Sequence, residues 1–278
     1  MSLAASLIPR ILVLALPLAA ACADPAADER AGEAAAGAAA VDGTADAAMI
    51  GGWYTDTTGL AAAAAAVPEA EARALLTGNT ARAITAAVTT PACVAVDTDQ
   101  ATYVAATFTA CTGPGGRGGL SGTVRGELGF ATTPCGPAQC PTALTWTMTA
   151  DLTWGDGAAL AGAWGIDAPL ATAAPRTLSG ALTAIARDGA TASSQATASW
   201  TRTADDCVAL DAQATLSGAA SGALTVTSLA ACPGACPTAG AVVLQGARGA
   251  LAWNYGAGTT VTVTAGEHSF ALPLACAR

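Results

Sequence analysis

Alternation of apolar and polar residues dominates the chain from Cys93 to Cys276. In the longest run, Leu144 to Trp154, the residues Leu, Trp, Met, Ala, Leu and Trp alternate with Thr and Asp. Because successive side chains of a strand point to opposite faces, this pattern predicts a strand with one buried face. Roughly a dozen such segments with short connections predict a mainly β fold, an antiparallel meander arranged as a large sheet, a sandwich or an open barrel.

Turn residues fix the register of several neighbouring strands. Folding about Asp156 brings large apolar residues together in three pairs: Leu152 with Leu160, Met148 with Trp164, and Trp146 with Ile166. A hairpin about Gly266-Glu267 matches Val263 with Phe270 and Val261 with Leu272, and Pro273 indicates that its second strand lies at a sheet edge. A further hairpin about Ala220 sets Leu216 opposite Leu224, and Asp188-Gly189 marks one more turn.

Residues 51–90 are helix-prone. Pro68 and the acidic residues after it suit a first helical turn, and Glu69 with Arg73 forms an i,i+4 pair. We expect Gly78-Asn79 to end this helix and Thr80 to cap a second short one. The sequence therefore predicts one or two short helices ahead of the β domain.

Residues 22–50 are predicted to be a disordered tether. Between residues 23 and 48 the chain is mostly Ala, Gly, Asp and Glu, with Val41 as the one large aliphatic residue. Such a segment buries too little surface to offset the entropy of ordering it.

Nine cysteines divide into Cys22, at the N-terminal end, and eight within the β region. Eight cysteines allow 105 pairings, but a meander places the start of one strand beside the end of its partner. The favoured pairs are Cys93–Cys111, Cys135–Cys140, Cys207–Cys232 and Cys236–Cys276. Regular alternation puts Cys207 and Cys232 on opposite faces, so either a bulge intervenes or Cys207 pairs with Cys236. A zinc site is the competing interpretation of these cysteines. It is disfavoured because the chain is expected to be exported and has a single histidine.

Cys22 directly follows a short apolar stretch from Ile11 to Ala21 that Arg10 precedes. This stretch is too short to span a bilayer and predicts a secretory signal over residues 1–21. With Ala20-Ala21-Cys22 at its end, the segment resembles the signal of bacterial lipoproteins, although Ala19 stands where the family usually has a larger aliphatic residue. The resemblance implies a lipid on Cys22. Ordinary cleavage at an A-x-A site after Ala21 or Ala23 is the alternative.

The resemblance covers only this segment and also bears on location. In Gram-negative lipoproteins an Asp directly after the Cys marks retention at the inner membrane. Here that position is Ala23, and Asp24 comes one residue later. The resemblance thus implies lipid anchoring at the outer membrane, whereas plain secretion implies the periplasm or the medium.

Charge and an internal repeat complete the domain picture. The chain has eleven arginines, no lysine and twenty acidic residues. This excess of negative charge argues against a nucleic-acid partner. Cys93-Val-Ala-Val-Asp97 recurs as Cys207-Val-Ala-Leu-Asp211. Chance similarity is one explanation of this short match, and the other is that the β domain, residues 91–278, consists of two related halves, 91–202 and 203–278.

Candidate chemistry is sparse. The one histidine, His268, lies beside a predicted turn and lacks the partners of a nucleophilic triad. Three carboxylate pairs would suit a hydrolase: Asp151 with Asp156, Asp97 with Asp99, and Asp205 with Asp206. Because Asp is common in turns for local reasons, we assign no catalytic, metal or cofactor residue and expect no enzyme.

The expected function is a non-catalytic binding or structural module of the cell envelope. Its partner is the membrane, through the lipid anchor, with a lipid, a glycan or an envelope protein as the possible ligand. A carboxylate-dependent hydrolase and an integral outer-membrane β-barrel are the alternatives.

Overall fold

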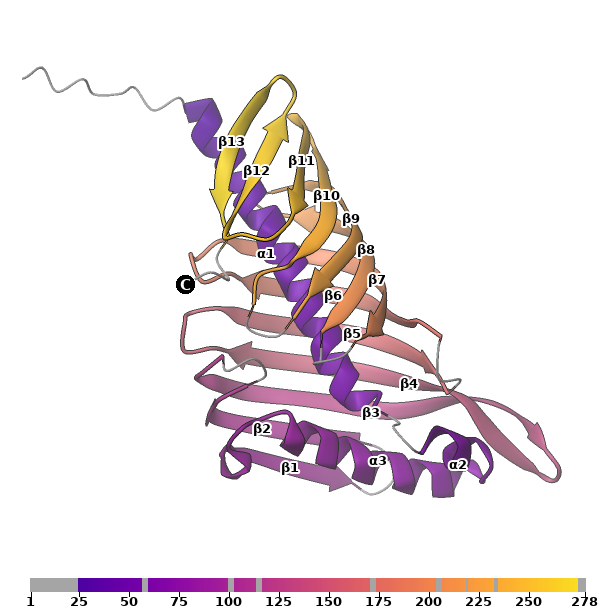
Figure 1. Ribbon diagram of the computed structural model, residues 1–278. Coiled ribbons are helices and arrows are strands. Elements are labelled where there is room, and N and C mark those ends of the chain that lie inside the picture. Colours follow the sequence, from indigo (N-terminus) through magenta and orange to yellow (C-terminus); the bar gives the residue numbers. More distant parts are fainter. Residues whose placement is uncertain are drawn as a thin grey trace, which may run out of the picture.

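One continuous antiparallel sheet forms the body of the protein (Figure 1). The computed structural model describes residues 25–56, 60–99, 103–113, 117–170, 174–203, 207–218, 220–232 and 235–274. Within these residues every strand pairs with its neighbours in chain order, which confirms the predicted meander. The strands are β1 (Val94–Asp99), β2 (Tyr103–Cys111), β3 (Leu120–Cys135), β4 (Ala138–Thr153), β5 (Ala159–Pro169), β6 (Arg176–Ile185), β7 (Thr191–Arg202), β8 (Val208–Ser217), β9 (Gly222–Ala231), β10 (Ala239–Gly246), β11 (Gly249–Tyr255), β12 (Thr260–Ala265) and β13 (His268–Pro273).

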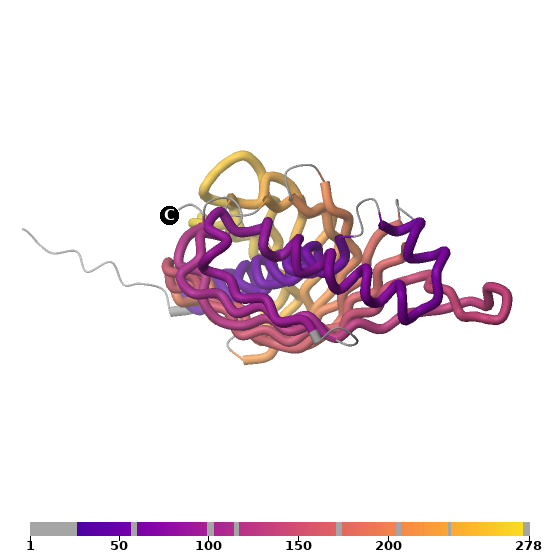
Figure 2. Tube along the Cα trace, turned by 90° about the horizontal axis from the view of Figure 1, so that it is seen from below, coloured from indigo at the N-terminus to yellow at the C-terminus, as the bar shows by residue number. Residues whose placement is uncertain are grey.

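The helices all precede the sheet and cover its inner face. They are α1 (Pro25–Tyr54), α2 (Ala61–Ala65) and α3 (Glu69–Ala86), followed by the 3₁₀ turn η1 (Pro91–Cys93). Helix α1 contacts β5 to β9 and also β13, whereas α3 contacts β1 to β4. A single helix can touch such distant strands because the sheet curls around it, as the view from below shows (Figure 2). No helix in the described part of the chain is both long and apolar enough to cross a membrane.

The prediction of a disordered tether over residues 22–50 is wrong where the structure describes it, because residues 25–54 form α1. Val41, Ile50 and a long series of alanines in α1 are buried against the sheet. Alanine has the highest intrinsic helix propensity, and its small side chain lets a helix lie deep inside a curled sheet. Composition gave the wrong prediction here because small side chains also bury apolar surface when a sheet surrounds them.

The second helical segment also differs from expectation. Helix α3 runs without a break through Gly78 and Asn79, so the predicted stop at these residues is wrong. The side chain of Asn79 donates a hydrogen bond to the carbonyl oxygen of Asp56 instead of ending the helix. The predicted ion pair between Glu69 and Arg73 is present, at 2.6 Å.

Hairpin registers were predicted well where alternation is strict. All three predicted pairs between β4 and β5 are observed. The pairs between β12 and β13 are also confirmed, and β13 lies at the edge of the described sheet. The inward residues Trp146, Met148 and Trp164 are fully buried and form part of the core.

The hairpin of β8 and β9 was predicted with the wrong register. Leu216 pairs with Gly222, not with Leu224, and the register shifts again between Leu210 and Ala212. At this bulge Ser228 adopts a φ of 52°, and its N–H donates to the Asp211 carboxylate at 2.7 Å. The bulge is the one that a Cys207–Cys232 bond required. The sheet continues from β7 into β8 without interruption, so it does not divide at residue 203.

Candidate functional site

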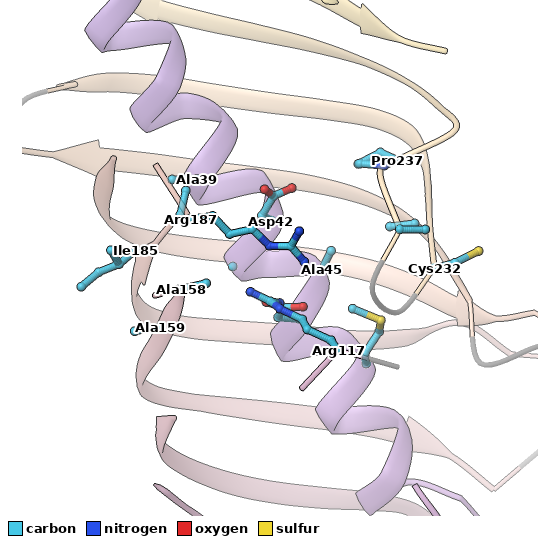
Figure 3. Close-up of a pocket in the computed structure, with 16 residues that line it drawn as sticks. Ala39, Asp42, Ala45, Arg117, Ala158, Ala159, Ile185, Arg187, Cys232 and Pro237 are labelled. Atoms are coloured by element: carbon cyan, nitrogen blue, oxygen red, sulfur yellow. The ribbon is translucent and has the colours of Figure 1, made fainter. Parts of the chain in front are cut away.

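A small cavity with four charged side chains in its lining lies between the middle of α1 and several loops of the sheet, among them those between β6 and β7 and between β9 and β10 (Figure 3). Its lining includes Asp42 and Asp46 from α1, Arg117 from the loop before β3, and Arg187 from the turn after β6. The cavity volume is about 60 Å³. That holds a few water molecules and is well below the roughly 300–1,000 Å³ of a typical small-molecule pocket.

Local structure explains how these side chains meet. Asp42 and Asp46 are four residues apart, so they project from the same face of α1. Asp156 lies in the turn between β4 and β5, where its carboxylate accepts a hydrogen bond from the N–H of Ala158 at 3.0 Å. Arg187 immediately precedes the predicted Asp188-Gly189 turn, which the structure places between β6 and β7.

Ion pairs join α1 to three loops. Arg117 lies 3.4 Å from the Asp46 carboxylate and 3.0 Å from that of Asp156. Arg187 reaches the same Asp156 oxygen at 2.6 Å. The Arg117 guanidinium also lies over the ring of Trp154, 4.2 Å from its centroid. Arg117 thus links the helix, the loop before β3 and the turn after β4.

Burial and neighbouring charges give the three carboxylates different proton affinities. Burial, reinforced by the negative charge of Asp46, raises the pKa of Asp42 to about 7, against the opposing effect of Arg117 and Arg187. Burial likewise raises the pKa of Asp46, although Arg117 opposes it. Burial acts in the same direction on Asp156, but hydrogen bonds from Arg117 and Ala158 and the charges of both arginines hold its pKa below the usual value.

The pair of Arg117 with Asp46 can therefore stabilise the packing of α1. Asp42, whose raised pKa allows it to be protonated near neutral pH, lies on the same face of the helix. Among the residues that the structure describes, no group of three or more His, Cys, Asp or Glu side chains has the geometry to hold a metal ion.

A second hollow lies on the outer face of the sheet, across β6 to β9. It is open and shallow, with a volume of about 480 Å³. Its polar lining consists mainly of hydroxyl and amide side chains: Thr177, Ser179, Thr197, Ser199, Gln213, Thr225 and Thr227. Its one charged residue, Asp211, accepts the hydrogen bond from Ser228 at the bulge. This surface can offer hydrogen bonds to a polar partner.

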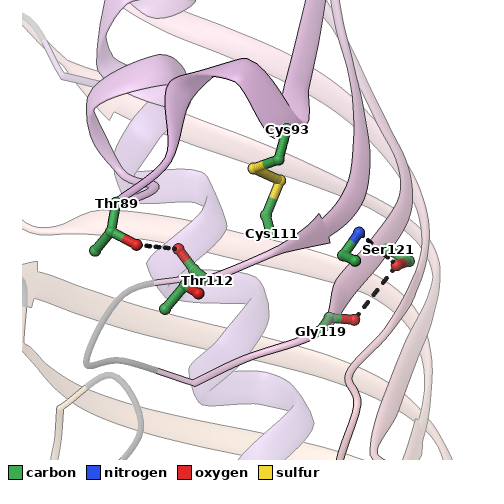
Figure 4. Close-up of a disulfide and its surroundings, with 7 residues drawn as sticks. Thr89, Cys93, Cys111, Thr112, Gly119 and Ser121 are labelled. Atoms are coloured by element: carbon green, nitrogen blue, oxygen red, sulfur yellow. Dashed lines mark hydrogen bonds between the residues drawn. A yellow bond between two sulfur atoms is a disulfide. The ribbon is translucent and has the colours of Figure 1, made fainter.

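Three of the four predicted disulfides are present. Cys93–Cys111 joins the start of β1 to the end of β2 (Figure 4), Cys135–Cys140 closes the β3–β4 hairpin, and Cys207–Cys232 closes the β8–β9 hairpin. The alternative pair of Cys207 with Cys236 is therefore wrong. Cys236 is itself disulfide-bonded, and the predicted partner Cys276 lies outside the described residues. So does Cys22.

The carboxylates singled out in the sequence do not come together as pairs. Asp156 is bound by Arg117 and Arg187, which line the cavity, but is not itself part of the lining. Asp151 is exposed on the outer face of β4, and Asp97 accepts a hydrogen bond from the Tyr103 hydroxyl. Asp205 and Asp206 lie outside the described residues. His268 is exposed at the start of β13.

Sequence reasoning missed Asp42, Asp46, Arg117 and Arg187. The two aspartates fall within the predicted tether, and the sequence pattern singled out neither arginine. One signal was available: two acids four residues apart within an alanine-rich stretch that continues into Met49, Ile50 and Trp53. That spacing is typical of one face of a helix.

Comparison with known proteins gives no relative from which a role could be transferred. No family model matches the chain, and neither a curated protein nor a solved structure matches it.

Proposed function

We propose that the chain is an exported, non-catalytic binding or structural module of the bacterial cell envelope, held at the outer membrane by a lipid on Cys22. The observation that carries this proposal is the position of α1. The chain's own helix fills the inside of the curled sheet, where a ligand or substrate would otherwise bind. A partner must therefore bind from outside.

The polar cavity supports the same conclusion. Asp46, Asp156, Arg117 and Arg187 are all engaged in ion pairs, one of which holds α1 to a loop while the other two join the loops to each other. Groups committed in this way contribute to packing and are poorly placed to turn over a substrate. The volume of about 60 Å³ also excludes a sugar ring or a peptide.

The environment of the protein follows from its disulfides. They form and persist in oxidising compartments, which indicates that the chain is exported. The outer face of the sheet carries mainly Thr, Ser and Gln side chains along β6 to β9, which suits contact with water or with a polar partner. The hollow on this face is the surface we assign to a glycan or an envelope protein.

Cell fractionation of a Cys22→Ser variant tests the anchor. The proposal predicts that the wild-type protein floats with outer-membrane vesicles and that Cys22→Ser is recovered in the soluble fraction. Ala23→Ser is the matched control and should stay with the membrane. A wild-type protein in the soluble fraction, or a Cys22→Ser variant that stays with the membrane, would contradict the proposal.

A carboxylate-dependent hydrolase is the second candidate, and one observation favours it. Asp42 and Asp156 both interact with Arg117 and Arg187, and their pKa values are shifted in opposite directions, as those of an acid and a base would need to be. A hydrolytic activity that is lost in both Asp42→Asn and Asp156→Asn but retained in the exposed Asp167→Asn would favour this candidate. The module proposed above predicts no such activity.

A further inference from the structure

The helix α1 begins much closer to Cys22 than a tethered domain would require. It starts at Pro25, so Ala23 and Asp24 are the two residues between it and Cys22. Three chain steps span at most about 11 Å even when fully extended. A lipid on Cys22 would therefore lie next to the folded domain.

The first turns of α1 are fixed to the sheet. The Arg30 guanidinium donates hydrogen bonds to the carbonyl oxygens of Gly249, at 3.5 Å, and Ala250, at 3.1 Å. Arg248, in the turn between β10 and β11, pairs with Glu29 and Glu33 of α1. These contacts restrain the start of α1 relative to the sheet.

The other end of α1 is fixed to different strands. The Tyr54 hydroxyl lies 3.1 Å from the carbonyl oxygen of Val104 on β2 and 3.3 Å from that of Val124 on β3. Arg30 and Tyr54 are 24 positions apart in one continuous helix. At 1.5 Å per residue, the two attachment points are separated by about 36 Å along the helix axis.

We propose that α1 is a rigid strut that orients the domain on the lipid bilayer, an inference that rests on the lipid anchor proposed above. The β10–β11 turn, residues 246–249, and the β12–β13 turn, residues 265–268, lie at one end of the domain (Figure 1). In this proposal that end contacts the phospholipid headgroups. The edge formed by β1 to β3 is held about 36 Å farther from the bilayer.

The charge of this membrane-facing end indicates what holds it there. Arg30 and Arg248 are offset by Glu29, Glu33 and Glu267, so the end is no basic patch. Attraction to anionic lipids therefore contributes little. The covalent anchor and the stiffness of α1 set the orientation, which should persist at high salt and in vesicles of neutral lipid.

The absence of lysine from the sequence provides a clean test. Arg248→Lys and Arg125→Lys each introduce one lysine, and the two arginines are matched: their side chains are 51% and 50% exposed, and each pairs with a glutamate. Arg125 follows Val124, which contacts the far end of α1. In the mature lipoprotein the amine of Cys22 is acylated, so an amine-reactive fluorophore labels the new lysine alone.

The labelled lipoproteins are reconstituted into neutral phosphatidylcholine vesicles that carry a headgroup-attached quencher. We expect the label at position 248 to be quenched several-fold more strongly than the label at position 125, at low and at high salt. Equal quenching, or stronger quenching at position 125, would overturn the strut although the anchor itself still holds. Insertion of a flexible Gly-Ser linker after Asp24 should abolish the difference while flotation persists.

Flotation of the same samples separates the two proposals. Proteins that do not float with vesicles contradict the lipid anchor, and with it the strut. Proteins that float but show no difference between the two labels contradict the strut alone.

Discussion

At Asp42, burial opposes ionisation. In the unfolded chain its pKa is near the ordinary value of 3.8, and in the folded protein it is about 7. The folded state therefore binds an extra proton between these two values. The stabilisation is fully present below about pH 4 and is lost as the pH rises through 7, up to about 4 kcal/mol in total.

Asp42→Asn should remove this pH dependence. Asparagine is neutral at every pH, so the variant should match the wild type near pH 4 and exceed it in free energy of unfolding at pH 8. Chemical denaturation across this range measures the difference. Asp167→Asn, on the exposed face of β5, is the control and should differ from the wild type by the same small amount throughout. A variant at position 42 that is less stable than the wild type at pH 8 would refute the assignment.

Arg117 is the residue that holds the cavity together. Lysine can replace its charge but not its planar fork, which spans Asp46 and Asp156 while stacking on Trp154. Arg117→Lys should lower the free energy of unfolding by about 2 kcal/mol.

Arg125→Lys is the matched control for Arg117→Lys. Arg125 also pairs with a carboxylate and lies over a ring, that of Tyr103. Its side chain is 50% exposed, against 15% for Arg117, so the same change should cost less than about 0.5 kcal/mol. Equal losses for the two variants would show that burial of the cavity pairs contributes nothing.

At the scale of elements, α1 shows why small residues matter for the fold. Gly43 lies so close to β6 that a Cβ added to it would be 2.5 Å from the Cβ of Ala184. The Ala184 Cβ is bonded directly to the strand backbone, so it cannot move aside without moving the strand. Glycine at this position sets how deeply the helix can enter the sheet.

Gly43→Ala should therefore destabilise the protein by about 1–3 kcal/mol through overpacking. Gly32, in the same helix, has no heavy atom within 4 Å of an added Cβ. Gly32→Ala should be neutral or stabilise by up to about 1 kcal/mol, since alanine favours the helix more than glycine does. Thermal unfolding of both variants measures the contrast, and a tolerated Gly43→Ala would show that α1 is not packed this tightly.

The sequence predicted the register of strands whose large side chains alternate with polar ones. It did not predict the helix that is built mainly from small side chains. The registers of β4 with β5 and of β12 with β13 follow from tryptophans, leucines and valines that must share one face. The β8–β9 register failed first at the turn, where Leu216 pairs with Gly222. It shifts once more at the bulge, where the positive φ of Ser228, stabilised by Asp211, leaves no trace in the alternation. Helix α1 failed because alanine and glycine resemble a linker until the sheet surrounds them.

At the scale of the whole molecule, the candidate site depends on α1, the helix that the sequence did not predict. Alternation along strands predicts which face of the sheet is buried but not how far the sheet curls or what fills it. Arg117, Asp156 and Arg187 pair among themselves, and Arg117 gains its second partner, Asp46, only when α1 lies inside the sheet. The sequence therefore predicted the sheet and three of its disulfides but could not predict the cavity.

Disulfides supplement a core that is rich in alanine. Cys207–Cys232 closes a separation of 25 residues, and Cys135–Cys140 closes one of 5. On loop-closure entropy, removing the first pair by double substitution to alanine should cost about 3.5 kcal/mol, and removing the second about 2 kcal/mol. Denaturant titration of both double variants tests this order. A larger loss for the short hairpin would show that strain, not loop entropy, controls their contributions.

We propose that the protein is an exported sheet that curls around its own N-terminal helix, is closed by disulfides and is anchored through Cys22. Intact-mass measurement of the mature protein from its native host, reduced and unreduced, tests this most directly. We predict a chain that starts at Cys22 with the added mass of a diacylglycerol and an acyl group, and that gains eight protons on reduction of the other eight cysteines. An unlipidated chain that starts at Cys22 or Asp24, or a mass that does not change on reduction, would contradict it.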